Sequence, residues 1–145
     1  MSDLPAVFVR VLASRLEGIA TLADEMSQWA EEAGVPPKAA AHMNLMLDEL
    51  ITNVVLYGYG EGQPGDIRVE ARLAANAMHV VLTDHAPAWD PLQAKAPDLE
   101  SGIEERAVGG LGVHFVRTLA DEVGYERIDE GGRGANRVRL VKRFA

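Results

Sequence analysis

The chain has 145 residues, of which 48% are hydrophobic and 25% are charged, so it can form one globular domain and is unlike disordered or membrane-spanning sequences. A net charge of −8 disfavours binding to nucleic acid, and the absence of cysteine excludes disulfides and thiolate chemistry. We expect a single domain over residues 1–145. Because no long apolar run or secretion signal is visible, we also expect a cytoplasmic protein that binds no membrane.

Hydrophobic periodicity predicts a strand over residues 5–12, an amphipathic helix over 14–33 and a second helix over 36–57. Ser14 and Glu17 have the spacing of a capping box, which predicts that the first helix begins there. The segment "GVPPK" separates the two helices, since proline is tolerated only in the first turn of a helix.

The glycine-rich segment "YGYGEGQPGD" precedes two alternating stretches, 66–74 and 77–84, which predict a tight hairpin joined at "AAN". Residues 85–110 show no sustained periodicity, which is typical of a lid or binding loop. A helix over 111–121 and strands over 122–128 and 134–143 follow. This order predicts an α/β (α+β) fold, a two-layer sandwich in which a mixed, mostly antiparallel sheet carries helices on one face.

Two polar features accompany these elements. Glu49 and Asn53 lie four residues apart on the second helix, about 40° apart around its axis, at the rim of its apolar stripe. Alone, this pattern is typical of a solvent-facing pair. Asp84 ends an apolar strand before a proline-containing turn, where a carboxylate either caps the turn or accepts hydrogen bonds from a ligand.

Glycines also cluster where the third helix begins. Gly109, Gly110 and Gly112 leave backbone N–H groups free at the positive end of the helix, which favours an anion such as phosphate. Alone, such a cluster is more typical of a tight turn. It is not a P-loop, because no Lys-Ser/Thr pair follows.

The segment "RVRLVKR" at 137–143 has a basic residue at alternate positions. In a strand this alternation places the basic side chains on one face. We interpret it as a solvated edge strand rather than a nucleic-acid patch.

Taken together, four stretches resemble a known family: "LDELITNVVLYGYG", "LTDHAPAWDP", "GGLGVHFVRTLADEVGYER" and "GANRVRLVKR". Their order resembles the Bergerat ATP-binding fold, which histidine kinases, the heat-shock chaperone, gyrase and mismatch-repair ATPases share. Within that fold the chain is most similar to the anti-sigma-factor serine/threonine kinases, which have a histidine-kinase-like ATPase domain.

The resemblance implies ATP and Mg²⁺ as cofactors and a role for each polar feature. Asn53 would ligate Mg²⁺ through its amide oxygen. Glu49 would accept the proton of the attacking hydroxyl as the general base. Asp84 would accept a hydrogen bond from the adenine amino group, and the segment Gly109, Gly110, Leu111 and Gly112 would hold the phosphates.

The chain departs from the family pattern at two places. Ala86, which would line the cofactor pocket, stands where the family has glycine. If that turn requires a positive φ or a close approach to the nucleotide, alanine weakens the adenine pocket. The lid over residues 93–110 lacks a lysine cluster for the γ-phosphate, and Arg106 is the nearest candidate.

The implied function is an anti-sigma factor that sequesters a sigma factor and transfers phosphate from MgATP to a serine on an anti-anti-sigma (antagonist) protein. The resemblance also implies a homodimer, with no direct contact to nucleic acid. Two alternatives stay open: a non-catalytic binding module that sequesters its partner, and a switch kinase that acts on a signalling scaffold protein.

Overall fold

The computed structural model describes residues 7–93 and 110–144, and its elements follow the predicted order. The helical elements are α1 (Gly18–Ala33), α2 (Pro37–Asn53), the π-helical segment η1 (Val54–Gly60), the short 3-10 helix η2 (Pro91–Gln93) and α4 (Gly110–Leu119). The strands are β1 (Val7–Ala13), β2 (Asp66–Ala74), β3 (Ala77–Asp84), β4 (Glu122–Glu130) and β5 (Arg133–Arg143).

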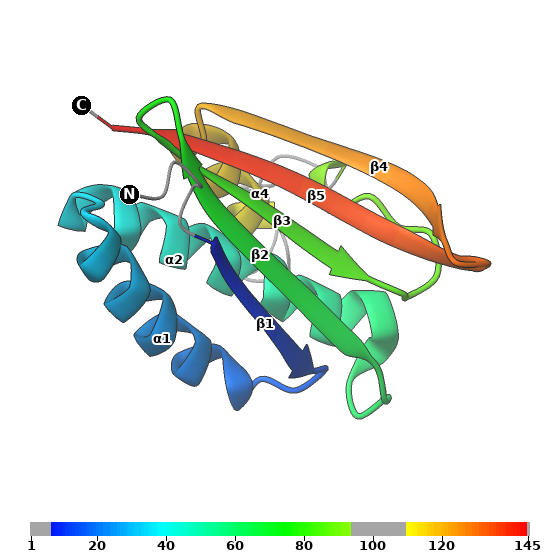
Figure 1. The fold of residues 1–145 in the computed structure, drawn as a ribbon. Helices are drawn as coiled ribbons and strands as arrows, with labels where there is room; N and C mark the ends of the chain where they lie inside the picture. Colours follow the sequence, from blue (N-terminus) through cyan, green and yellow to red (C-terminus); the bar gives the residue numbers. More distant parts are fainter. Residues whose placement is uncertain (1–6, 94–109, 145) are drawn as a thin grey trace.

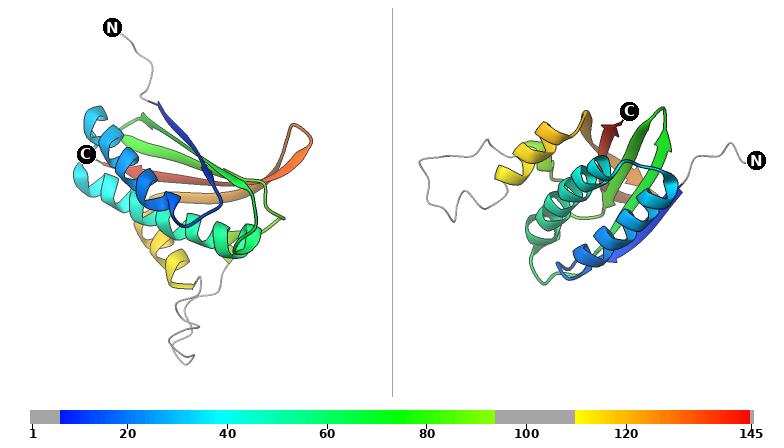
Figure 2. Two further views of the ribbon diagram at one scale, coloured as in Figure 1. Left: turned by 90° about the horizontal axis from the view of Figure 1, so that it is seen from below. Right: turned by 90° about the vertical axis from the view of Figure 1, so that its left-hand side faces the viewer.

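The five strands form one sheet in the order β1-β2-β3-β5-β4. Every neighbouring pair among these described strands is antiparallel. We expected a mixed sheet that is mostly antiparallel, and this part of the prediction is wrong. Helices α1, α2 and α4 cover one face of the sheet and leave the other open (Figures 1 and 2). The predicted two-layer sandwich is therefore confirmed.

Helix α2 lies at the centre of the core. Its buried residues recur at helical spacing, and they include Met43, Met46, Leu47, Leu50 and Ile51. They belong to the same cluster as the alternate, helix-facing residues of the central strands, such as Ile67, Val69, Val80, Leu82, Val138 and Leu140. This packing fixes α2 along the sheet, and with it any side chain at the rim of the helix.

The capping box predicted at the start of α1 is wrong. The helix begins at Gly18, and Glu17 stands at the N-cap without a side-chain hydrogen bond to the helix. Ser14 is buried, and its backbone N–H donates to the carbonyl oxygen of Gly65 at 2.8 Å. Ser14 thus continues the pairing of β1 with the start of β2, and this tertiary contact overrides the local helix signal.

The hairpin predicted between β2 and β3 is confirmed. Ala75 and Asn76 both have positive φ, 53° and 57°, as a two-residue type I′ turn requires. By contrast, β5 is not the edge strand that its basic residues suggested. It lies between β3 and β4, and Arg137 and Arg139 both form ion pairs with Glu126 of β4 on the open face.

None of the helices within the described residues is long and apolar enough to cross a membrane.

Two leucines on α2 provide a matched test of this packing. Leu47 is 1% exposed and Leu45 is 40% exposed. Leu47→Ala should lower the free energy of unfolding by about 2–5 kcal/mol, because it leaves a cavity in the core. Leu45→Ala should change it by about 0.5 kcal/mol or less. Urea unfolding measures both, and equal losses would show that α2 presents a different face to the sheet.

Candidate functional site

Asp84 is the buried acid of the site. It is the last residue of β3 and 5% exposed, and it follows Val80 and Leu82 on the face covered by the helices. Its Oδ1 accepts hydrogen bonds from the backbone N–H of Ala86 and from Asn136 Nδ2, both at 2.9 Å. No hydrogen bond between described residues uses its Oδ2. One oxygen therefore caps the turn, and the other makes no hydrogen bond within the described residues.

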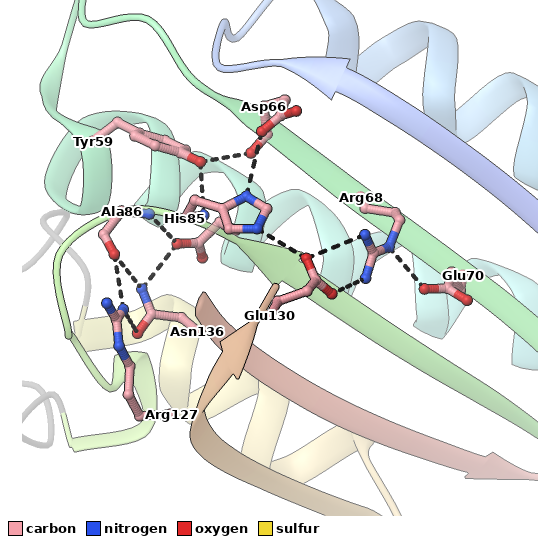
Figure 3. A network of polar contacts seen from close by, with 10 residues as sticks. Tyr59, Asp66, Arg68, Glu70, His85, Ala86, Arg127, Glu130 and Asn136 are labelled. Carbon is pink, nitrogen blue, oxygen red and sulfur yellow. Dashed lines mark hydrogen bonds and ion pairs between the residues drawn. The ribbon is translucent and has the colours of Figure 1, made fainter. Parts of the chain in front are cut away.

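Asn136 is a site residue that the sequence analysis missed. It lies on β5 directly opposite Asp84 and is 3% exposed. Besides Asp84, its Nδ2 contacts the carbonyl oxygens of Ala86 and Pro87. Its Oδ1 accepts from Trp89 N–H, Tyr125 O–H and Arg127 Nη1, and Figure 3 shows the contacts with Ala86 and Arg127. The available signal was a polar residue at a core-facing position of an alternating strand. Asn136 joins β5, β4 and the turn after β3.

The Asp84 carboxyl has a raised pKa, which a further hydrogen-bond donor would lower. Burial raises the pKa of its carboxyl above the ordinary value, and the hydrogen bonds from Asn136 and Ala86 offset only part of that rise. A ligand N–H donated to the free oxygen would therefore stabilise the charged form.

Ala86 fits its turn without backbone strain. The only described residues other than glycine with positive φ are Ala75 and Asn76, so the turn at Ala86 does not require glycine on that ground. Ala86 is 1% exposed and lies against Gly58 of η1, where an added Cβ would be 3.5 Å from the Ala86 Cβ. The expectation that a positive φ would make alanine unfavourable is thus not met. Its effect on a bound nucleotide stays a prediction.

The second polar group of the site lies on α2. We expected Glu49 and Asn53 at the rim of the helix, but Asn53 is 5% exposed and therefore buried, whereas Glu49 is half-buried. Burial raises the pKa of Glu49, and the charge of the neighbouring Asp48 raises it further. A glutamate with a raised pKa is a stronger proton acceptor once ionised.

The environment of Asn53 fits a Mg²⁺ ligand. The residue is 5% exposed, and none of the side-chain hydrogen bonds between described residues involves its amide, whose atoms are not among the fully buried polar atoms that lack a partner. Within residues 7–93 and 110–144, no group of three or more His, Cys, Asp or Glu residues could hold a metal ion. Mg²⁺ is commonly held by one or two protein oxygens together with substrate phosphates, which agrees with a single amide ligand.

The glycine segment lies partly within the described residues. Gly110, Leu111 and Gly112 form the first turn of α4, so the predicted helix entry is at a helix N-terminus. Helix α4 packs against α2, which carries Glu49 and Asn53. Gly109 and the predicted lid, including Arg106, lie outside the described residues.

The turn after Asp84 is also held from its other side. His85 Nε2 lies 2.9 Å from Glu130 Oε1, and Arg68 Nη2 lies 2.6 Å from the other oxygen of the same carboxylate. The backbone N–H of His85 donates to the Tyr59 hydroxyl at 2.8 Å (Figure 3). The sequence alone does not predict this role of Tyr59, because a tyrosine in a glycine-rich segment does not show its partner.

Comparisons with known proteins find a matching family and similar proteins. The model of a family described as "Histidine kinase-like ATPase domain" matches residues 12–142. The chain is 26% identical over 114 residues to the serine/threonine-protein kinase BtrW of Bordetella bronchiseptica, covering 76% of this chain and 80% of that protein. It is 28% identical over 102 residues to the serine-protein kinase RsbW of Listeria monocytogenes, covering 68% of this chain and 65% of that protein.

A further relative is the anti-sigma F factor of Clostridium botulinum, 27% identical over 105 residues, with 68% of this chain and 66% of that protein covered. The chain thus spans about two thirds of the length of two of these three relatives. Among solved structures, the RsbU and RsbW domains of Rv1364c from Mycobacterium tuberculosis are similar with a TM-score of 0.59 at 17% identity. That match covers 97% of this chain and 34% of the other, and it shows the fold alone.

The raised pKa of Asp84 predicts how stability changes with pH. The folded-state pKa of Asp84 is above its unfolded-state value, so the folded chain holds this proton more tightly. The resulting contribution to the free energy of unfolding is fully present below the ordinary pKa of aspartate and is lost as pH rises through the raised folded-state pKa. Asp84→Asn removes this ionisation but keeps an oxygen that can accept both hydrogen bonds. At neutral pH the variant should be at least as stable as the wild type in urea unfolding, and below the ordinary pKa of aspartate the advantage should vanish. A variant that is less stable by the same amount at every pH would contradict this assignment.

Proposed function

Because the chain belongs to the histidine kinase-like ATPase domain family, we propose that it is an ATP-dependent anti-sigma factor with serine-protein kinase activity. It sequesters a sigma factor and phosphorylates a serine on an anti-anti-sigma antagonist protein. The names of its relatives, two protein kinases and an anti-sigma factor, support this proposal. The observation that carries it is the combination of Glu49 and buried Asn53 on α2 with a half-satisfied, buried Asp84 on β3.

In this proposal the adenine binds at the turn after β3. The free Oδ2 of Asp84 accepts a hydrogen bond from the adenine amino group, while Asn136 and the Ala86 N–H hold the other oxygen in place. The phosphates bind at the first turn of α4, where Gly110, Leu111 and Gly112, with Gly109 before them, offer backbone N–H groups.

In this proposal the terminal phosphate of ATP lies next to α2. Asn53 holds Mg²⁺ through its amide oxygen. When bound, the metal supplies charge neutralisation and orientation for the phosphate chain, which is most of what phosphoryl transfer requires. Because Asn53 is fixed by a helix whose neighbouring residues form the core, its amide needs little reorganisation to serve as a ligand.

Glu49 acts as the general base. Its carboxylate takes the proton of the substrate serine as the serine oxygen bonds to the γ-phosphorus. The bond from that phosphorus to the bridging oxygen breaks, and ADP leaves with the bonding electrons. One turn of helix separates Glu49 from Asn53, so the base and the metal ligand lie on the same side of α2.

The partners are also proposed. The chain acts in the cytoplasm, as a homodimer, without direct contact to nucleic acid or membrane. Val7, Val9 and Val11 are 59%, 45% and 62% exposed on the edge strand β1, and such an apolar row is a candidate surface for a second copy or a protein partner.

Phosphotransfer by purified variants tests this function. Partners that co-purify with the tagged chain, with and without MgATP, are identified by mass spectrometry and offered as phosphate acceptors with γ-labelled ATP. Glu49→Gln should lower transfer by about 10²–10⁴-fold and leave ATP affinity almost unchanged, because only the base is lost. Asn53→Ala should lose Mg²⁺-dependent ATP binding.

The same assay separates the rival functions. Undiminished transfer by Glu49→Gln would contradict the role of the base. MgATP binding and partner capture without any phosphate transfer by the wild type would instead indicate the non-catalytic sequestering module.

The pH dependence of transfer tests Glu49 in a second way. Transfer requires the ionised carboxylate, so the rate should rise with pH through the raised pKa of Glu49. Asp48→Asn removes the neighbouring negative charge and lowers that pKa, so the acid limb of the profile should move to lower pH. Glu32→Gln changes charge equally on α1 and should leave the profile unchanged. An acid limb that does not move in Asp48→Asn would contradict Glu49 as the titrating base.

A further inference from the structure

Tyr59 connects three parts of the fold through one hydroxyl group. The residue belongs to η1, which continues directly from α2. Its hydroxyl accepts the backbone N–H of His85 at 2.8 Å and donates to the carbonyl oxygen of Asp66 at 2.7 Å (Figure 3). These atoms belong to the turn after β3 and to the first residue of β2. The Tyr59 side chain, from the π-helical segment that follows α2, therefore bonds to His85, the residue after Asp84.

The ring of Tyr59 is held in place as well. It covers Gly65 so closely that a Cβ at that position would lie 2.4 Å from the ring atom Cε1. Only glycine admits the ring there. Burial raises the pKa of the Tyr59 hydroxyl, so it remains protonated and able to donate to Asp66.

The residue before Tyr59 makes the neighbouring contact. A Cβ added to Gly58 would lie 3.5 Å from the Cβ of Ala86, which is ordinary van der Waals distance. Consecutive residues of η1 thus lie beside consecutive residues of the turn, with Tyr59 bonded to His85 and Gly58 near Ala86. The turn carrying Asp84 cannot shift relative to η1 without loss of the hydrogen bond between Tyr59 and His85.

We infer that Tyr59 is a positioning residue that sets the Asp84 turn against the α2 segment, and so fixes the spacing between the adenine and phosphate ends of the site. This inference rests on the proposed nucleotide site. Asn53 is the last residue of α2, and η1 begins at the next residue, so the link from the metal ligand to the adenine acceptor runs through seven residues of continuous helix. Tyr59 does not contact the nucleotide in this account. It acts through the backbone of His85.

Tyr59→Phe tests the inference, because it keeps the ring over Gly65 and removes only the hydroxyl. Affinity for MgATP, measured by calorimetry on the full chain, should fall by about tenfold, the factor expected for one lost hydrogen bond of ordinary strength. Affinity for MgGTP should not change, because GTP has no amino group at the position that Asp84 reads. The ratio of ATP to GTP affinity should therefore fall.

Tyr57→Phe is the matched control. Tyr57 is 44% exposed in the same segment, and its hydroxyl makes no hydrogen bond to another described residue. Removal of that hydroxyl should leave both affinities unchanged. Wild-type ATP affinity in Tyr59→Phe, or an equal loss for ATP and GTP, would overturn the inference. A wild-type chain that binds no MgATP would overturn the proposed function itself.

Amide hydrogen exchange in the wild-type chain tests the inference even if Tyr59→Phe folds poorly. In the wild-type chain the His85 amide should be protected from exchange because it donates to the Tyr59 hydroxyl, and MgATP should increase that protection. A rapidly exchanging His85 amide in the nucleotide-bound wild type would overturn the positioning role of Tyr59 without any substitution.

Discussion

The hydrogen bond between Asn136 and Asp84 joins β5 to the end of β3 and holds a carboxylate that burial makes costly to ionise. Asn136 also donates to the carbonyl oxygens of the turn that follows β3. The same amide therefore holds both this turn and the Asp84 carboxylate in position. This pair and the Ala86 N–H occupy only one carboxylate oxygen, so in the proposed function the other oxygen is the one that accepts the ligand. A core made only of apolar residues at these two positions would be easier to form but would bind nothing specific.

Helix α2 combines a structural role, through its core-facing residues, with a chemical role beside that core, where Asn53 is itself buried. Its methionines and leucines fill the core against the sheet, and this packing is what keeps Glu49 and Asn53 in fixed positions. The turn with Asp84 is fixed separately by the sheet, through β5. The Tyr59 hydroxyl of η1 connects these two rigid parts. We therefore regard the site as two preorganised halves, and we infer that their separation is set by a short π-helical segment rather than by the nucleotide.

Much of this was visible in the sequence, because periodicity reports which face of an element is buried. The order of elements, the β2–β3 hairpin and the helices on one face followed from it. Three features did not follow. Ser14 pairs with Gly65 instead of capping α1, Asn53 is buried instead of lying at a rim, and Asn136 becomes a site residue only when β5 lies beside β3. Each depends on a neighbour distant in sequence. The position of β5 between β3 and β4 also depends on strand order, which alternating arginines in the sequence do not predict.

The central claim is that Asp84 and Asn53 belong to the two ends of one nucleotide site. A crystal structure of the chain with Mg²⁺ and a non-hydrolysable ATP analogue tests this claim most directly. Our account predicts the adenine amino group within hydrogen-bonding distance of Asp84 Oδ2 and the metal bound to the amide oxygen of Asn53 between the phosphates. An analogue bound elsewhere, or bound with its adenine away from Asp84, would contradict it.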